Sequence, residues 1–545
     1  MPEPTIPAAG AHPHHASKAG SKMTAIQHFE VPHLALWKSC VAEVLAKDAG
    51  QSRSNGSGID LDHPLMRATD RYCQAMLENA PLAKPAADSN DEAAVLAFLS
   101  YLHHKRAHAR IGKDKALEAE IEAQTLEFKF GNPLWQQMYV QYFKYYWQYP
   151  FHKGAQPQYR SWQTGPGNGD LQYGVIQWKL PAKTRVAIVG DIGTGTCEAA
   201  AVLISALKFR PDAILHLGDV YFSGTPFETS HRLMGMLRDV LKSERARVPF
   251  FTVPGNHEYF TGGVSMLRAL DSGKLVVEPT QQQQASYFCL RTADGGWQFL
   301  GLDTGYYGHY MNVAGAAQQA TLDRLHIGKV ETATAADPHW PTTHNPYFSP
   351  PQNTTVNVDQ VTVRPDEAVW HQDKLANFAG RSILLSHHQL YSALDVCGIA
   401  QKDASDFNRI WINTGLWRQF GPTFGDHVAA WIWGHEHNLE IFEDNYRPAD
   451  WPNTPEATQI FKTLPKGRCA GHSAIPVQES EAPYAQKYPV NLKQPDLKLG
   501  LTEGWYNHGF QIMEIQGAGQ PARLSYFQVA GADPTPLPLF VEQVV

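Results

Sequence analysis

The sequence has few cysteines, no long apolar run and no excess of positive charge. Its six cysteines are scattered over 545 residues without a C-x-x-C pair, which excludes a disulfide framework or a zinc ribbon and favours a reducing, cytoplasmic location. No apolar run approaches the ~20 residues that span a bilayer, so no membrane partner is expected. The N-terminus has no basic start and no apolar core, and it is not expected to be a secretory signal. The net charge of -7 does not indicate a nucleic-acid partner.

The chain is too long for one simple core, so we expect a large domain with an additional one. Residues 1–22 are rich in Pro, Ala and Gly and are predicted to be a disordered tail. Residues 23–160 are predicted to form an α-helical domain. Its clearest helix follows Asn132, a capping residue, and Pro133, and carries aromatic residues at three- and four-residue spacing.

The pattern changes after the Gly/Pro-rich stretch 161–170. Short apolar runs such as "RVAIVGD", "DAILHLGD" and "RSILLSHH" alternate with helical stretches such as "CEAAAVLISALKF". Strands that alternate with helices predict an α/β domain, placed at residues 171–535, and their apolar character predicts a sheet covered on both faces. Residues 306–365 interrupt this domain with a Pro-, Asn- and Thr-rich insertion, which is typical of a lid or binding loop.

Metal-ligating residue types follow these apolar runs at the points where the strands should end. The carboxyl ends of strands in an open α/β sheet form the usual ligand crevice, and five strands deliver donors there. The donors are Asp191, Asp219, Asn256, His257, Glu258, His387, His388, His435 and His437. Four of these groups follow a glycine that permits a sharp turn.

Mixed Asp, Asn and His ligation suits Mn²⁺, Zn²⁺ or Fe, and a bridging carboxylate can hold two such ions ~3.5–4 Å apart. The ordered set GD-x-G, GD-x-Y, GNHE, a strand ending in His387, and GHEH resembles the metallophosphoesterase (calcineurin-like phosphoesterase) superfamily over residues 184 to about 530. The resemblance implies a four-layer α/β/β/α sandwich, and it implies phosphoric ester hydrolysis by a hydroxide that bridges two metal ions.

The same resemblance implies a role for each matched residue. Asp191, Asp219 and His437 would hold the first metal ion, with Asp219 bridging to the second. Asn256, His387 and His435 would hold the second ion. His257 would approach the substrate phosphate or the leaving oxygen, and Glu258 would orient His257.

The first motif departs from the commonest family pattern, because Gly193 stands where most members have histidine. The purple acid phosphatase branch shares this D-x-G motif and compensates with a tyrosine three residues after the bridging aspartate. Here Tyr221 lies two residues after Asp219. We expect Tyr221 near the metal but not bound to it.

Several other residues have two readings. His388 is adjacent to His387 and should point to the opposite face, so we favour a supporting or core role over ligation. His472, in a Gly-flanked turn, is expected either to contact substrate or to be satisfied within the turn. Asp303 is read as structural, whereas Tyr306, Tyr307 and His309 are candidates to line the substrate entrance.

The predicted function is metal-dependent phosphoric ester hydrolysis, by a phosphomonoesterase or phosphodiesterase. The substrate, a phosphorylated small molecule or macromolecule, is not fixed by the sequence. The alternative is a catalytically decayed metal-binding or regulatory module that acts through its helical domain. A dinucleotide site in "VAIVGDIGTGTCEAA" is disfavoured, because its spacing does not match G-x-G-x-x-G.

Overall fold

The computed structural model describes residue 116 and residues 160–545, the latter with gaps. The gaps are residues 164–168, 222–223, 225–226, 260–262, 274, 276–282, 309–360, 399–406, 425–426, 449–453, 478, 480–481 and 503. The predicted tail (1–22) lies outside the described residues. So do the predicted helical domain (23–160), apart from residues 116 and 160, and most of the predicted insertion. Those three predictions therefore stay predictions.

The first six-stranded sheet joins three parallel strands to an antiparallel extension, in the order β14-β13-β12-β1-β2-β3. The bounds are β1 Thr184–Val189, β2 Ala213–His216, β3 Phe250–Thr252, β12 His508–Ile515, β13 Ala522–Val529 and β14 Leu537–Val544. β1 pairs in parallel with β2, and β2 with β3, whereas β12 is antiparallel to β1. The carboxyl ends of β1, β2 and β3 therefore meet at one edge. β14 lies beyond residue 535, where the sequence placed the end of the domain.

The second six-stranded sheet has the order β4-β5-β6-β7-β9-β8. The bounds are β4 Phe288–Arg291, β5 Trp297–Leu302, β6 Arg381–Ser386, β7 Val428–Trp433, β8 Leu439–Ile441 and β9 Gly467–Ala470. β5, β6, β7 and β9 are parallel, and the edge strands β4 and β8 are antiparallel to their neighbours. A separate pair, β10 (Leu501–Thr502) and β11 (Trp505–Tyr506), forms a small antiparallel ribbon.

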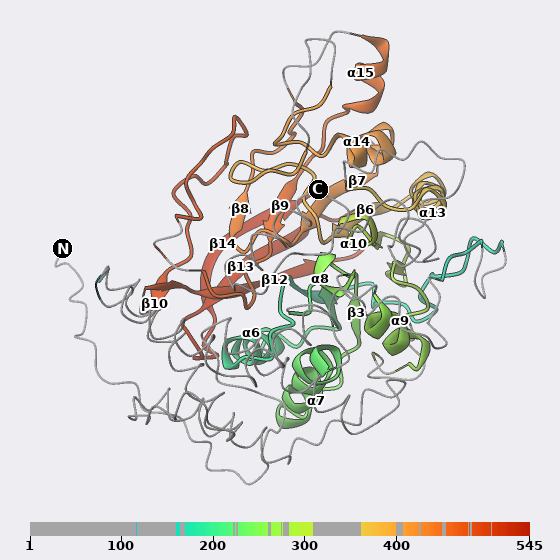
Figure 1. Cartoon of the computed structure of the whole chain (residues 1–545). Coiled ribbons are helices and arrows are strands. Elements are labelled where there is room, and N and C mark those ends of the chain that lie inside the picture. Colours follow the sequence, from blue (N-terminus) through green and yellow to red (C-terminus); the bar gives the residue numbers. More distant parts are fainter. Residues whose placement is uncertain are drawn as a thin grey trace, which may run out of the picture.

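Helices connect the strands and pack on the sheets (Figure 1). Their bounds are α6 Cys197–Leu207, η2 Glu228–Leu233, α7 Met234–Ser243, α8 Asn256–Tyr259, α9 Val264–Asp271, α10 Gly305–Gly308, α13 Pro365–Ala376, α14 Thr414–Phe420, η3 Gly421–Thr423 and α15 Pro455–Ile460. α6 begins after Thr196, whose hydroxyl accepts from the Ala199 amide and so caps the helix. α13 begins with proline at its first position, where a missing N–H costs nothing.

Two hydrophobic clusters hold these elements together. One contains alternate residues of both sheets, among them Val186, Ile188, Phe299 and Ile383, so the sheets pack face to face through it. The residues between them in sequence, such as Ala187 and Leu384, belong to a second cluster that includes the buried faces of α6, α7, α13 and α14.

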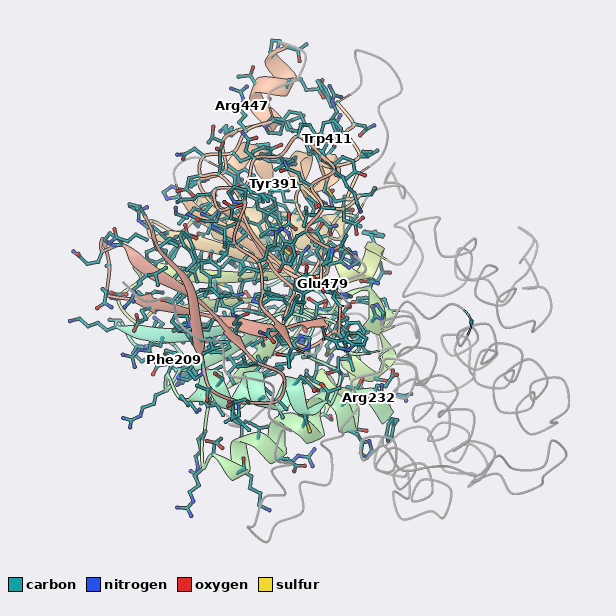
Figure 2. The ribbon with its side chains drawn as sticks, turned by 90° about the vertical axis from the view of Figure 1, so that its left-hand side faces the viewer. Phe209, Arg232, Tyr391, Trp411, Arg447 and Glu479 are labelled. Atoms are coloured by element: carbon teal, nitrogen blue, oxygen red, sulfur yellow. The ribbon has the colours of Figure 1, made fainter. Side chains whose placement is uncertain are left out.

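The outer faces carry extensive aromatic packing. Phe209 packs on the first sheet against Phe510 and Phe527, with ring centroids 5.9 and 4.5 Å away. On the second sheet, Tyr391 lies 5.1 Å from the Trp433 ring. Figure 2 shows Phe209 and Tyr391 in these separate parts of the molecule.

The predicted α/β class is confirmed by these two mixed sheets and their helices. Each apolar run quoted from the sequence became a strand of a sheet. No helix within the described part of the chain is both long and apolar enough to cross a membrane.

Candidate metal centre

The donor residues lie just beyond the ends of parallel strands. Asp191 follows β1, Asp219 follows β2, Asn256 follows β3, His387 follows β6, and His435 follows β7. Asp191, Asp219 and His435 have φ angles of 62°, 75° and 68°. Non-glycine residues rarely adopt this left-handed region, and such strain clusters at functional sites. The local fold therefore bends the backbone to bring these three side chains together.

Two glycines give these side chains the room they need. A Cβ on Gly255 would overlap Asp219 Oδ1, and a Cβ on Gly434 would lie 2.6 Å from Asp191 Oδ2. Neither glycine has a positive φ. Their role is therefore to allow close approach, which adds to the turn-forming role expected from the sequence.

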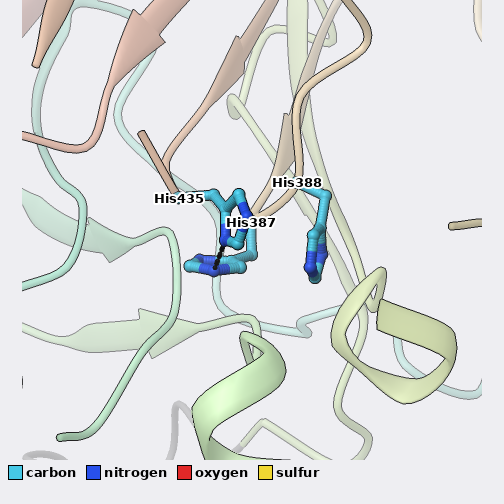
Figure 3. Close-up of side chains that lie close together, drawn as sticks. All are labelled: His387, His388 and His435. Carbon is cyan, nitrogen blue, oxygen red and sulfur yellow. Dashed lines mark hydrogen bonds between the residues drawn. The ribbon is translucent and has the colours of Figure 1, made fainter. Parts of the chain in front are cut away.

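One group of donor atoms surrounds a point between β3, β6 and β7. His387 Nε2 lies 3.0 Å from Asn256 Oδ1 and 3.0 Å from His435 Nδ1. His435 Nδ1 lies 3.1 Å from Asn256 Oδ1. Asp219 Oδ1 lies 3.3 Å from His387 Nε2. Figure 3 shows the His387 and His435 rings turned toward one another.

The hydrogen-bond partners of His387 identify this group as suited to a cation. His387 Nδ1 lies 2.9 Å from the Leu217 carbonyl, which can only accept, so Nδ1 carries the hydrogen. In a neutral imidazole, Nε2 then directs a lone pair at the Asn256 oxygen and at the second imidazole. A carbonyl that fixes one ring nitrogen in this way is the usual support for a metal-ligating histidine.

A second group adjoins the first at Asp219. The donor atoms of Asp191, Asp219 and His437 all lie within 4.8 Å of one another. The Tyr221 hydroxyl lies among them, 2.8 Å from Asp191 Oδ1, 3.0 Å from Asp219 Oδ2 and 3.0 Å from His437 Nε2. A hydroxyl has one hydrogen, so it cannot donate to all three atoms. Arg232 fixes the backbone here by donating to the Tyr221 carbonyl at 3.1 Å.

The spacing of both groups fits a metal-ligand shell. Two ligand atoms at ~2.1 Å from a metal ion lie about 3.0 Å apart at a right angle and about 3.4 Å apart at a tetrahedral angle. The separations of 3.0–3.3 Å around His387 agree with this range. The residues present therefore fit metal ions at both groups, with one carboxylate oxygen of Asp219 turned to each.

Comparison with known proteins agrees with this geometry. Residues 184–439 match the family model described as calcineurin-like phosphoesterase. These residues form a calcineurin-like phosphoesterase domain. The prediction of the family is confirmed. No curated protein matches the chain.

Among solved structures, the chain is similar to a purple acid phosphatase isolated from yellow lupin (Lupinus luteus) seeds. The two share 12% identity over 67% of this chain and 55% of that chain, with a TM-score of 0.35. This chain thus spans little more than half the length of the lupin protein.

Charge in the phosphoesterase domain's site is balanced among buried groups. Burial raises the pKa of Asp191 to about 8, and nearby Asp219 acts in the same direction. Burial also opposes ionisation of Asp219, but His387 and His257 outweigh it and hold the pKa of Asp219 well below its usual range. For His387, burial favours the neutral ring, yet the Asp219 carboxylate prevails and raises the pKa to about 9. The cavity therefore favours positive charge beside Asp219.

His435 and His437 are held in the neutral form. Burial lowers the pKa of His435 to about 3 and that of His437 to about 4. A neutral imidazole has the free lone pair that a metal ion requires. Both rings can therefore bind metal near neutral pH without first losing a proton.

His257 lies on the open side of the site. Its side chain is 22% exposed, and Nε2 lies 3.8 Å from Asp219 Oδ2. Its amide donates to Asp219 Oδ1 at 3.1 Å, which places α8 against Asp219. Glu258 Oε2 accepts from the Gly255 amide at 3.0 Å and so fixes the turn that precedes α8. Burial raises the pKa of Glu258 to about 8.

His388 and His472, for which the sequence left two roles open, occupy different places. His388 lies beside His387 and His435, and its Nδ1 is 3.1 Å from Thr304 Oγ1. His472 is buried beside Gly509, and neither of its ring nitrogens forms a hydrogen bond with the described residues.

Asp303 is structural, as expected: it accepts from Tyr259 and Ser286 hydroxyls, each at 2.5 Å. Tyr306 and Tyr307 are buried in the hydrophobic core, which argues against lining an entrance. His309 lies outside the described residues.

Sequence reasoning missed the groups that hold the donors in place. The Leu217 carbonyl orients His387, Thr304 orients His388, and Arg232 fixes the Tyr221 backbone. The first is a main-chain atom and leaves no sequence signal. The usable signal was the oppositely charged pair Glu228 and Arg232, four residues apart in "ETSHRLMGM", which are both buried and form an ion pair.

Proposed function

We propose that the phosphoesterase domain hydrolyses phosphoric esters with the help of two metal ions. Asp191, Asp219 and His437 would hold one ion. Tyr221 would be a further ligand, in place of the unbound role expected from the sequence, because its hydroxyl lies 2.8–3.0 Å from donor atoms of all three. Asp219, Asn256, His387 and His435 would hold the other. The observation that carries the proposal is the position of Asp219, whose Oδ2 lies 3.0 Å from Tyr221 Oη while Oδ1 lies 3.3 Å from His387 Nε2.

The donor set indicates the kind of ion. Carboxylate, amide and imidazole ligands suit Mn²⁺, Zn²⁺ and Fe, and a tyrosine hydroxyl adds a preference for ferric iron at the first position. Two such cations would neutralise the phosphate oxygens and activate a water for in-line attack on phosphorus. None of the proposed ligands of these two ions is a cysteine or methionine sulfur.

The chain's own residues would bind and protonate the substrate. His257 and His437 are the more exposed members of the site, with side chains 22% and 31% exposed, so the phosphate would enter on their side. His257, when protonated, would stabilise the negative charge on the departing oxygen. Glu258 would act through the backbone of α8 by holding the Gly255 amide.

The test is turnover by chelator-stripped protein reloaded separately with Mn²⁺, Zn²⁺ or Fe. The substrates are p-nitrophenyl phosphate and bis-p-nitrophenyl phosphate, whose relative rates decide between monoester and diester preference. Asp219→Asn removes the bridging charge, and Asp373→Asn in α13 is the matched control. We expect metal-restored turnover that Asp219→Asn abolishes and Asp373→Asn retains.

Metal uptake without turnover on either ester would contradict the proposal. It would favour the alternative of a metal-binding module that has lost its chemistry.

The cytoplasmic location stays a prediction; the four cysteines in the described part of the chain are all free.

A further inference from the structure

Behind the loop that carries His435 and His437 lies a second group of ligand-type side chains. Glu436 comes from that loop, Glu440 from β8 and Cys469 from β9. Glu440 and Cys469 are directly opposed in the antiparallel β8–β9 pair. The three side chains are buried, with exposed fractions of 5%, 2% and 0%. One ligand atom of each lies within 4.8 Å of the other two.

The two carboxyl groups of this cluster are poorly satisfied. All four oxygens of Glu436 and Glu440 are buried without a hydrogen-bond partner among the described residues. The Ser392 hydroxyl, the Ala393 amide and the Cys469 thiol face them, and the two carboxyls face each other, but none of these groups lies in good hydrogen-bonding geometry. Two buried carboxyls that face each other need either a shared proton or a cation between them, and a cation would also account for the thiol beside them.

The thiol of Cys469 faces oxygen atoms on several sides. Its Sγ lies 3.5 Å from the Glu436 carbonyl, 3.7 Å from the Asn438 carbonyl and 3.5 Å from Asn438 Oδ1. One thiol hydrogen cannot serve all of these acceptors. In a tetrahedral zinc site, a sulfur ligand and an oxygen ligand lie about 3.6 Å apart. The distance from Sγ to Asn438 Oδ1 agrees with that value.

We propose that Glu436, Glu440 and Cys469 bind a thiophilic divalent cation of the zinc class, with the Asn438 amide oxygen as fourth ligand. A thiolate among oxygen ligands selects zinc over magnesium or calcium. The ion is structural, because its ligands are buried and closed to substrate. It joins β8 and β9 to the loop of His435 and His437, and so positions both histidines for the candidate metal centre.

The test uses Co²⁺ as a spectroscopic replacement for zinc. The candidate metal centre has no cysteine, so absorption from thiolate-to-cobalt charge transfer reports on the second site alone. Metal-free, reduced protein is titrated with CoCl₂, and the absorption at saturation is expected to correspond to one thiolate-bound cobalt ion per chain. Cys469→Ser should abolish it, and the matched control Cys289→Ser, in β4, should retain it. Glu440→Gln should weaken binding by more than the roughly 10–100-fold that an outer-shell loss costs.

Three results would overturn the proposal: no charge-transfer absorption in the wild type, absorption that survives Cys469→Ser, or unchanged cobalt affinity in Glu440→Gln. Circular dichroism of each variant separates loss of a ligand from loss of the fold. Asp219→Asn should keep the cobalt absorption while it loses the candidate metal centre. Failure of this second site and failure of the proposed hydrolase are therefore distinguishable.

Discussion

The Tyr221 hydroxyl offers a sharp test of the site, because it lies 2.8–3.0 Å from donor atoms of Asp191, Asp219 and His437. Tyr221→Phe removes this oxygen and keeps the ring. Loss of an outer-shell partner lowers metal affinity by roughly 10–100-fold, or about 1.4–2.7 kcal/mol, and loss of a direct ligand costs more. We expect the first ion to be weakened by at least tenfold and the second to be nearly unaffected.

The assay is calorimetric titration of metal-free protein in the Cys469→Ser background, which leaves only the two binding steps of the candidate metal centre. Iron-loaded wild type should also show tyrosinate-to-iron charge-transfer absorption, and Tyr221→Phe should not. In metal-free protein the hydroxyl donates to a buried carboxylate, so the variant should lose about 1.5–3 kcal/mol of unfolding free energy. Tyr306→Phe, also buried but in α10, is the matched control. If Tyr221→Phe binds both metal ions with wild-type affinity, the assignment of Tyr221 to the first ion is refuted.

Three further outcomes follow from the structure. Gly255→Ala should prevent binding of both ions in the same calorimetric titration, because its Cβ would overlap Asp219 Oδ1; retained binding would show that α8 can shift. Leu384→Ala should cost about 2–5 kcal/mol in urea unfolding, since it leaves a cavity between β6 and the helices; a smaller loss would mean the core collapses. Burial opposes ionisation of Glu542, but Arg468 prevails and holds the pKa of Glu542 below its usual range. Its stabilisation is therefore complete above about pH 4.5 and is lost as the pH falls toward the folded-state pKa, so Glu542→Gln should flatten this loss in acid unfolding curves. An unchanged pH dependence would exclude Glu542 as the cause.

The donors at the strand ends were predictable because each follows a short apolar run that can only be a buried strand. Asp191 and Asp219 then lie at one edge of the first sheet, because β1 and β2 are parallel, and His387 lies at the carboxyl end of β6 in the second sheet, which packs on the first. Local sequence specifies both the strand and the polar residue that ends it.

Tyr221 was predicted near the metal, but the contact of its hydroxyl with donor atoms of Asp191, Asp219 and His437 was not predictable in the same way. Its position depends on the loop after Asp219, on the left-handed backbone of that residue and on the Arg232 bond to the Tyr221 carbonyl. Arg232 comes from a π-helical turn, η2, which runs directly into α7. Long-range contacts of this kind leave no periodic signal in the sequence.

The tautomer of His387 and the surroundings of Glu436 were out of reach for a related reason. One depends on the Leu217 carbonyl, and the other on the register of β8 with β9. Main-chain atoms and strand register are set by the assembled fold, so no single motif encodes them.

The central claim is that two metal ions share Asp219. Anomalous diffraction at the metal absorption edges, from crystals of the metal-loaded protein, tests it most directly. At the candidate metal centre the account predicts two peaks ~3.5–4 Å apart, one between Asp191 and His437 and one between His387 and His435, with Asp219 contacting both. A single peak at this centre, or two peaks that Asp219 does not join, would contradict it.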